Sequence, residues 1–378
     1  MKIYHTAFLP RGFSASAVSC GLKKSGKLDL ALFYSRIPAK AKGVFTSNTM
    51  AAAPVRVCRE HLARAKSHRA IIANSGNANC FTGVQGMRDA REMAASAARH
   101  LGVESSAVLI GSTGIIGKRL AIGKIKSKLN DLVQGLSGRG ISPAKKAIMT
   151  TDRFTKEATA VFSVGKAKVT VCAVAKGAGM IAPNMATMLA FVFTDARITA
   201  RALDQALRSS VDATFNCITV DGCMSTNDSV IVMANGAADN RLIDERHGFA
   251  VFQQALHAVL HHLAVMMVKD GEGATKFIRI NIVQAASEAE AKKAALAVAN
   301  SNLFKTAMYG QNPNFGRIVA AIGASGIPVQ EEKLKIRLSD LRKKEITVDV
   351  GLGRGRAQAA VYTSDLTPEY IKINAAYN

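Results

Sequence analysis

Two kinds of hydrophobic pattern alternate along the chain. Short, nearly continuous apolar runs predict buried strands at residues 28–34, 70–73, 107–110, 168–175, 188–193, 230–233, 277–283 and 346–350. Stretches in which Ala, Leu and Met recur every three or four positions predict helices at residues 85–100, 200–211, 252–269 and 287–299. Strands and helices interleave without a regular strand–helix–strand repeat, so periodicity predicts a mixed α/β protein.

The length and composition are those of a globular protein. The chain has 378 residues, 48% of them hydrophobic, which is enough for one large domain or two. The longest apolar runs are interrupted, as 258–268 is by His261 and His262, before the roughly 18 residues that a membrane span needs. No secretory signal is visible, so we expect a cytoplasmic protein without membrane contact.

Cysteine and histidine positions do not predict a metal site. The six cysteines are scattered without a C-x-x-C pair, which is typical of reduced thiols. His257 and His261 are one helical turn apart, but Glu does not follow the first of them, as it does in a zinc-hydrolase helix. We therefore interpret them as ordinary helix residues.

The net charge of +23 raises the alternative of a nucleic-acid-binding protein. The basic residues are dispersed in small groups, however, and the chain has no Trp and only 6% aromatic residues on which bases could stack. Two other uses of the charge remain: a positive field that attracts carboxylate-bearing substrates, or a solvated surface adapted to a basic proteome. The pattern argues against nucleic-acid binding as the main function.

A segment near the middle of the chain carries candidate chemistry. Residues 176–189 place a Gly-rich turn before an Ala186–Thr187 bond, and an apolar run follows. A Thr at the start of such a run is usually a packing residue of a buried strand. Its hydroxyl could also attack the Ala186 carbonyl carbon, which would cut the chain and leave Thr187 as a new N-terminus. The nucleophile would then have its own base, because an α-amino group has a pKa of about 8.

The segment KGAGMIAPNMATMLAFVFTDA at residues 176–196 closely resembles the self-cleavage segment of the ornithine acetyltransferase (glutamate N-acetyltransferase) family of arginine biosynthesis. The resemblance extends over nearly the whole chain and keeps the family's order of motifs. Further matching strings are GF at 12–13, KSGK at 24–27, DLAL at 29–32, GVFT at 43–46, NSGNAN at 74–79, STGIIG at 112–117, MTTD at 149–152, FNCITVDG at 215–222, STND at 225–228, KDGEGATK at 269–276, NPNFGR at 312–317, DLT at 365–367 and IN at 373–374.

The resemblance implies a fold, a cut and a reaction. The implied fold is a layered α-β-β-α sandwich, one interwoven core cleaved into an α chain, 1–186, and a β chain, 187–378. The implied reaction moves the acetyl group of N2-acetyl-L-ornithine to L-glutamate through an acetyl-Thr187 intermediate. It needs no metal or organic cofactor, acetyl-CoA is a candidate co-substrate, and the cleaved chains are expected to form an α2β2 assembly.

The resemblance also implies roles for single residues. Thr113 and Gly114 match the pair that forms the oxyanion hole of the family, although the string that contains them first suggests a phosphate-binding loop. That interpretation fails because such a loop needs Gly at the position of Ser112 and Ser or Thr at the position of Arg119. The predicted substrate contacts are Thr150 (with Thr151 as the neighbouring alternative), Lys176, Thr187, Glu272 and Asn374.

The sequence departs from the family's pattern at three places. Cys223 and Met224 stand where the family usually has Asp-Thr, and Phe315 replaces a common Trp. A substrate-contacting hydroxyl residue expected at the end is not seen in this sequence, which stops at Asn378.

Two alternatives to the acetyltransferase remain: an autoprocessed amidohydrolase or aminopeptidase of related architecture, and a non-enzymatic basic relative that binds nucleic acid.

Overall fold

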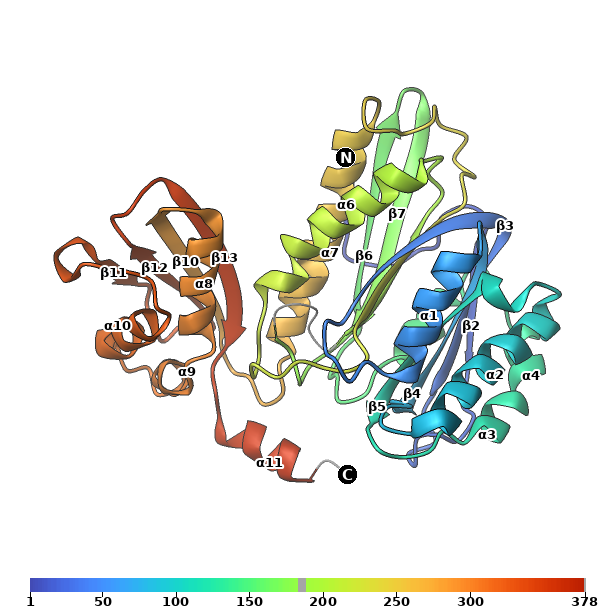
Figure 1. Cartoon of the computed structure of the whole chain (residues 1–378), viewed down its shortest axis with the longest axis horizontal. Coiled ribbons are helices and arrows are strands. Elements are labelled where there is room, and N and C mark those ends of the chain that lie inside the picture. Colours follow the sequence, from blue (N-terminus) through green and yellow to red (C-terminus); the bar gives the residue numbers. More distant parts are fainter. Residues whose placement is uncertain (183–187, 377–378) are drawn as a thin grey trace. The chain divides into compact units, whose positions relative to one another are not determined.

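The computed structural model describes residues 1–182 and 188–376 (Figure 1). It divides into two compact units, each assembled from separate parts of the chain. The first comprises Met1–Gly177, Thr187–Thr214 and Met224–Leu263, and the second comprises Ala178–Ala186, Phe215–Cys223 and Ala264–Asn378.

The first unit is built on a nine-stranded sheet in the order β1-β6-β7-β8-β9-β3-β4-β5, with β2 paired to β3. The strands are β1 (Lys2–Tyr4), β2 (Phe13–Val18), β3 (Leu30–Phe45), β4 (His68–Asn77), β5 (Val108–Ile115), β6 (Lys156–Val164), β7 (Ala167–Lys176), β8 (Leu189–Thr194) and β9 (Ser229–Ala234). Its helices are α1 (Ala53–Arg64), α2 (Gly83–Leu101), α3 (Ile122–Lys126), α4 (Leu129–Gln134), α5 (Ile141–Ala147), α6 (Ala200–Asp212) and most of α7 (Phe249–Lys269).

The long strand β3 joins two layers of this sheet. Its first part, from Leu30 to Tyr34, pairs with β2 and β4, and its last part, from Lys40 to Phe45, pairs with β9. The pairing register with β4 shifts between Tyr34 and Ala39, where Pro38 interrupts the strand pattern. The two layers therefore share one strand that bends between them.

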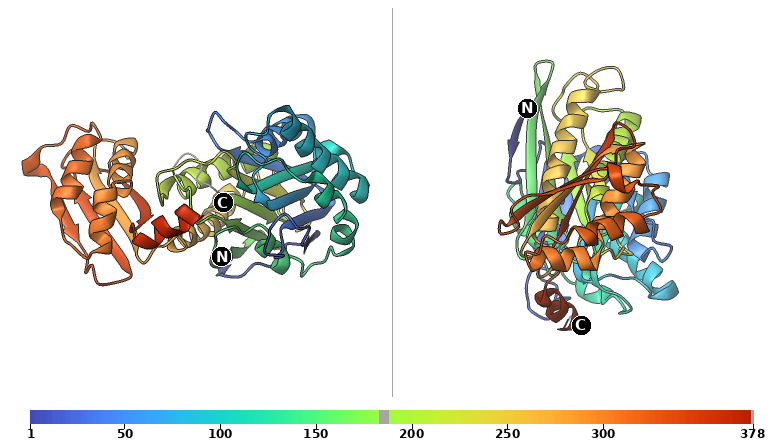
Figure 2. Two further views of the ribbon diagram at one scale, coloured as in Figure 1. Left: turned by 90° about the horizontal axis from the view of Figure 1, so that it is seen from below. Right: turned by 90° about the vertical axis from the view of Figure 1, so that its left-hand side faces the viewer.

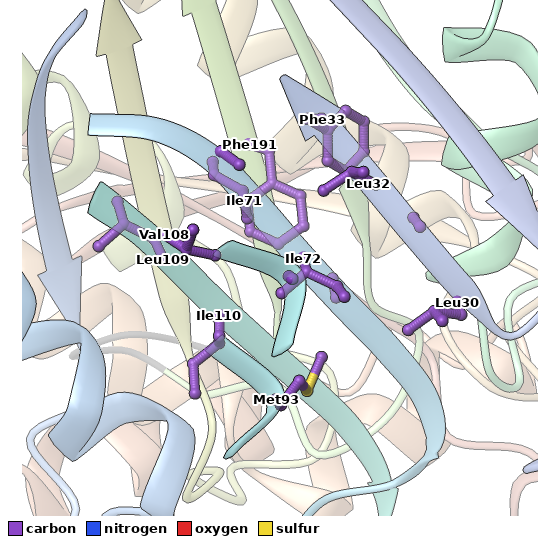
Figure 3. Close-up of a cluster of buried hydrophobic side chains, with 14 of the residues drawn as sticks. Leu30, Leu32, Phe33, Ile71, Ile72, Met93, Val108, Leu109, Ile110 and Phe191 are labelled. Carbon is purple, nitrogen blue, oxygen red and sulfur yellow. The ribbon is translucent and has the colours of Figure 1, made fainter. Parts of the chain in front are cut away.

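The core of the first unit lies between these layers. Phe33 of β3 faces Phe191 and Phe193 of β8, with ring centroids 5.4 Å and 5.0 Å apart. Figure 3 shows Phe191 beside Ile71 of β4. Helices α1 and α2 pack on the β4–β5 layer, whereas Phe252 of α7 contacts Phe162 of β6. The predicted layered α/β fold is thus confirmed.

The second unit has its own core. Its sheet has the order β11-β12-β10-β13 and is formed by β10 (Phe277–Ala285), β11 (Lys335–Leu338), β12 (Glu345–Gly351) and β13 (Ala357–Ser364). Its remaining helices are α8 (Glu288–Ala299), α9 (Asn302–Tyr309), α10 (Phe315–Ala324) and α11 (Pro368–Ala376) (Figure 2). Buried Ile residues of β10 alternate toward the apolar face of α8. The sequence pattern did not separate this unit, because no linker-like segment borders it.

Helix α7 is long and apolar enough to cross a membrane by length and composition, with a mean hydropathy of 1.3. Half of the window that meets this test is buried inside the protein. Leu256, Leu260 and Leu263 on this helix are fully buried. A core helix of a globular protein passes the same test, and the burial of α7 fits that interpretation.

Candidate active site

The predicted cleavage point lies between two neighbouring strands of the first unit. Strand β7 ends at Lys176 and pairs with β8, whose first residue, Leu189, is its direct partner. All six residues of β8 are buried, as expected for a continuous apolar run in the middle of a sheet. Ala186 and Thr187 themselves lie outside the described residues, as does Asn378.

Met188, the residue that follows Thr187, has both its backbone N–H and its carbonyl hydrogen-bonded. The Met188 N–H donates to Asp228 Oδ1 at 3.0 Å, and the Met188 carbonyl accepts from the Ser229 N–H at 3.0 Å. Asp228 is completely buried, and this burial raises the pKa of its carboxyl well above the ordinary value. The start of β8 is therefore held by a carboxyl group as well as by the sheet.

The predicted oxyanion residues end strand β5. Gly114 has φ +132°, and a Cβ at this position would lie 2.5 Å from the carbonyl carbon of Gly76 on the neighbouring strand. Only a glycine allows the two strands to approach so closely at this backbone conformation. β4 and β5 pair in parallel, and their register shifts at Gly76 and Asn77, directly opposite Gly114.

Three polar side chains hold this turn in place. Ser112 Oγ donates to Asn74 Oδ1 at 2.6 Å, and Asn74 Nδ2 donates to the Asn77 carbonyl at 2.9 Å. Asn227 Nδ2 donates to the carbonyls of Ser112 at 2.8 Å and Ala78 at 2.7 Å. Asn74 and Asn227 occur in the strings that carry the family resemblance, but the sequence analysis assigned them no role.

Lys176 lies against the predicted oxyanion hole. Its side chain is buried, with 3% of the residue exposed, and Nζ donates to Thr113 Oγ1 at 3.2 Å. An ammonium group has donors and no acceptor, so the Thr113 hydroxyl accepts from Lys176 and keeps its own proton for another acceptor. The structure therefore brings together Thr113, Gly114 and Lys176, and leaves the Thr113 O–H suited to bind a developing oxyanion.

Asp152 connects Lys176 with Thr150, and the sequence analysis missed it. Its Oδ2 accepts the Thr150 N–H at 2.9 Å, and its Oδ1 accepts the Gly177 N–H at 2.7 Å and Lys156 Nζ at 2.6 Å. Burial opposes ionisation of Asp152, but the charges of Lys176 and Lys156 outweigh this effect and hold the pKa of the carboxyl below its ordinary value. Its position directly after the Met149–Thr150–Thr151 string was the available signal.

The other two predicted substrate contacts come together in the second unit. Asn374 of α11 donates through Nδ2 to Glu272 Oε2 at 2.9 Å. The Glu272 N–H donates to the Ala178 carbonyl at 3.0 Å, and a Cβ at Gly179 would lie 2.3 Å from Glu272 Oε2. The glycine-rich segment before the cleavage point thus makes room for the Glu272 carboxylate.

A second carboxyl group of this unit, Asp221, holds the same segment. It accepts the N–H groups of Met180 at 2.6 Å and Ile181 at 2.9 Å, and the Tyr370 hydroxyl at 3.3 Å. Met180 has φ +56°, a left-handed conformation that is uncommon for a residue with a side chain. Exposed Cys223, one of the departures from the family pattern, donates its N–H to Asp221 as well, so the exchange keeps this backbone contact.

The described residues have two features of an acyl-transfer site: a tight glycine turn at Gly114 and a hydroxyl, that of Thr113, which accepts from a buried lysine. The ArgJ family model matches residues 14–378. The arginine biosynthesis bifunctional protein ArgJ of Geobacter sulfurreducens is 46% identical over 97% of this chain and 99% of its own length. Its counterpart in Symbiobacterium thermophilum is 44% identical over 97% of both chains.

Two solved structures are also similar to parts of this chain. The arginine biosynthesis bifunctional protein ArgJ of Bacillus halodurans is 38% identical, with a TM-score of 0.48, and covers 50% of this chain and 98% of its own. Ornithine acetyltransferase of Mycobacterium tuberculosis, complexed with ornithine, is 33% identical, with a TM-score of 0.44, and covers 50% of this chain and 99% of its own. The chain belongs to the ArgJ family, and the family predicted from the sequence is confirmed.

Proposed function

We propose that this chain is a self-processing acetyltransferase of arginine biosynthesis that moves the acetyl group of N2-acetyl-L-ornithine to L-glutamate, with Thr187 as nucleophile. One observation carries the proposal. Two consecutive residues connect the end of β5, which carries Thr113 and Gly114, with the start of β8. Asn227 donates to the Ser112 carbonyl, and Asp228 accepts the Met188 N–H. This pairing supports a common site for Thr113, Gly114 and Thr187.

The approach of β5 to β8 supports the same arrangement. A Cβ at Gly111, two residues before Thr113, would lie 3.1 Å from Phe191 Cζ and 3.5 Å from Leu189 Cδ1. Strands β5 and β8 therefore approach each other at Gly111 and Leu189. Thr113 is two residues from Gly111 in the sequence, and Thr187 is two residues from Leu189.

In the first step, the Thr187 hydroxyl attacks the Ala186 carbonyl carbon, the C–N bond breaks, and the acyl group passes to oxygen. Water then hydrolyses the ester, which releases the Ala186 carboxylate and leaves Thr187 with an α-amine. In the transfer step, the Thr187 hydroxyl attacks the acetyl carbon and its α-amine accepts the proton. Ornithine leaves with that proton, and the amine of glutamate attacks the acetyl ester and regenerates Thr187.

The oxyanion of each tetrahedral intermediate would accept from the Thr113 hydroxyl and the Gly114 N–H. One such donor typically lowers the barrier by about 3–4 kcal/mol. Thr150, Lys176, Glu272 and Asn374 are the proposed substrate contacts, with Lys176 suited to an α-carboxylate and Glu272 to an amine. The net charge of +23 supports attraction of these carboxylate substrates.

We further propose a cytoplasmic enzyme with two cleaved chains in an α2β2 assembly, without a metal or organic cofactor, and with acetyl-CoA as a second acetyl donor. Among the described residues, no group of three or more His, Cys, Asp or Glu side chains gathers in a way that could hold a metal ion. The chemistry proposed for Thr187 needs no such ion.

The first test compares intact masses of the wild type and Thr187→Ala under denaturing conditions. We expect two wild-type fragments that meet at Ala186 and Thr187, and one full-length variant. The cleaved protein is then incubated with N-acetylornithine and glutamate, with N-acetylornithine alone, and with acetyl-CoA and glutamate. Release of acetate without transfer would support the hydrolase alternative, and one full-length mass in both proteins would overturn the mechanism.

A further inference from the structure

Asp228 is a buried carboxyl to which the proposed reaction steps assign no chemical part. Its exposed fraction is 0%, and Oδ1 accepts the Met188 N–H at 3.0 Å. Within residues 1–182 and 188–376, its second oxygen, Oδ2, has no hydrogen-bond partner. Burying an oxygen without a hydrogen-bond partner lowers stability, so its position requires an explanation.

The surroundings of Asp228 make it a rigid anchor. The Asp228 carbonyl accepts the Thr46 N–H at 3.0 Å, and the preceding residue, Asn227, is fixed by its two hydrogen bonds to the oxyanion turn. The next residue, Ser229, begins β9 and pairs directly with Leu189 of β8. Both the carboxyl and its backbone are therefore locked to the two strands that flank the site.

Met188 is the residue through which Thr187 is attached to this framework. Before the cut, the chain holds Thr187 from both sides. After the cut, the peptide bond to Ala186 is gone, and Met188 is the one covalent attachment that remains. The precision with which Met188 is held then sets how precisely the hydroxyl and α-amine of Thr187 can be aimed.

We propose that Asp228 is a positioning residue for the Thr187 nucleophile, which it orients by binding the Met188 N–H. This inference rests on the proposed role of Thr187. Burial raises the pKa of the Asp228 carboxyl well above its ordinary value, while the Met188 N–H and the charge of Lys176 lower it.

The test uses three substitutions at Asp228. Asp228→Ala removes the acceptor, Asp228→Leu removes it while filling the space, and Asp228→Asn keeps an Oδ1 acceptor in a neutral group of the same shape. For Ala and Leu we expect self-cleavage about tenfold to 100-fold slower, and a similar loss of kcat with little change of KM in the cleaved fraction. For Asn we expect both rates within about threefold of the wild type.

Asp195 provides the matched control, because it is the corresponding buried carboxyl beyond the other end of β8. Its exposed fraction is 1%, burial raises its pKa, and it accepts the N–H groups of Thr170 at 2.8 Å and Arg11 at 3.4 Å. Asp195→Ala removes a buried acceptor from the same strand region without touching Met188. We expect it to lower the thermal midpoint but to leave the cleavage rate unchanged.

Each outcome bears on a different statement. The role of Asp228 would be overturned if the wild type is cleaved and the Ala and Leu variants cleave and turn over as fast as Asp195→Ala. That result would leave the proposed role of Thr187 unchanged. Slow Ala and Leu variants that Asn does not rescue would also overturn the hydrogen-bond explanation. A wild type that stays uncut and matches Thr187→Ala would instead overturn the proposed function.

Discussion

At the residue scale, the predicted site depends on Gly114, because a residue with a side chain could not have this backbone conformation so close to the neighbouring strand. Gly114 combines φ +132° with a Cβ position 2.5 Å from the carbonyl carbon of Gly76. A side chain there would push β5 away from β4 and displace the Gly114 N–H, the proposed oxyanion donor.

We therefore expect Gly114→Ala to lower the rate of acetyl transfer by about 100-fold or more, because losing one oxyanion donor has an effect of that size. Steady-state kinetics on cleaved protein measures it. Gly117→Ala is the control: its φ of +83° is also positive, but a Cβ there meets nothing within 4 Å. Equal activity of the two variants would show that backbone strain, rather than displacement of the turn, determines the outcome.

A second prediction at this scale concerns Asp152 and pH. The folded-state pKa of Asp152 lies below its ordinary value of about 3.9, so its stabilising contribution is complete above that pH and is lost as the pH falls toward the folded-state pKa. Asp152→Asn also leaves buried Lys156 and Lys176 without their shared anion. We expect it to lower the free energy of unfolding by about 3–5 kcal/mol at pH 7.

Urea unfolding of the wild type and Asp152→Asn at several pH values from 3 to 7 checks this prediction. The difference between them should stay constant above about pH 4 and shrink below it. Asp131→Asn, which breaks the solvent-exposed ion pair between Asp131 and Lys128, should change stability little at any of these pH values. A difference that grew as the pH fell would contradict the assignment of a lowered pKa to Asp152.

At the scale of the elements, the sequence pattern predicts those strands and helices whose burial is simple. Strands β8 and β9 are buried on both faces and appear as continuous apolar runs, and α6 and α8 have one apolar side. The pattern did not predict strands β6 and β13, because small and polar residues interrupt their apolar positions. The second part of β3 was missed for the same reason, because Pro38, Lys40 and Lys42 interrupt its apolar positions.

The sequence predicted those candidate site residues that stand in a recognisable motif. It did not predict residues whose part in the site depends on contacts with distant segments of the chain. The resemblance named Thr113, Gly114 and Lys176, and the structure brings these three together. The sequence could not reveal that Asp152 lies between two lysines or that Asp228 binds Met188. These roles arise from strand pairing and complete burial, which no local pattern specifies.

At the scale of the whole molecule, the first unit takes strands from both sides of the proposed cut. Strands β1 to β7 precede it, β8 and β9 follow it, and β8 pairs with both β7 and β9. Breaking one peptide bond between β7 and β8 leaves all of this pairing and the shared core in place.

We accordingly expect the 1–186 and 187–378 fragments to elute together in native size-exclusion chromatography and to separate in denaturant. Thr187→Ala, as an uncut control, should elute with the cleaved wild type at the same volume in native buffer. Separate elution of the wild-type fragments without denaturant would mean that β8 does not hold them together.

The place of β8 in its sheet also has a consequence for the timing of protein synthesis. The partners that secure its first residues, Asp228 and β9, are synthesised about 40 residues after Thr187. Under the proposed mechanism, a growing chain would remain intact until translation had passed these residues and the sheet had closed around β8. The cut would then mark a finished fold, so truncated products of interrupted synthesis would stay in one piece and inactive.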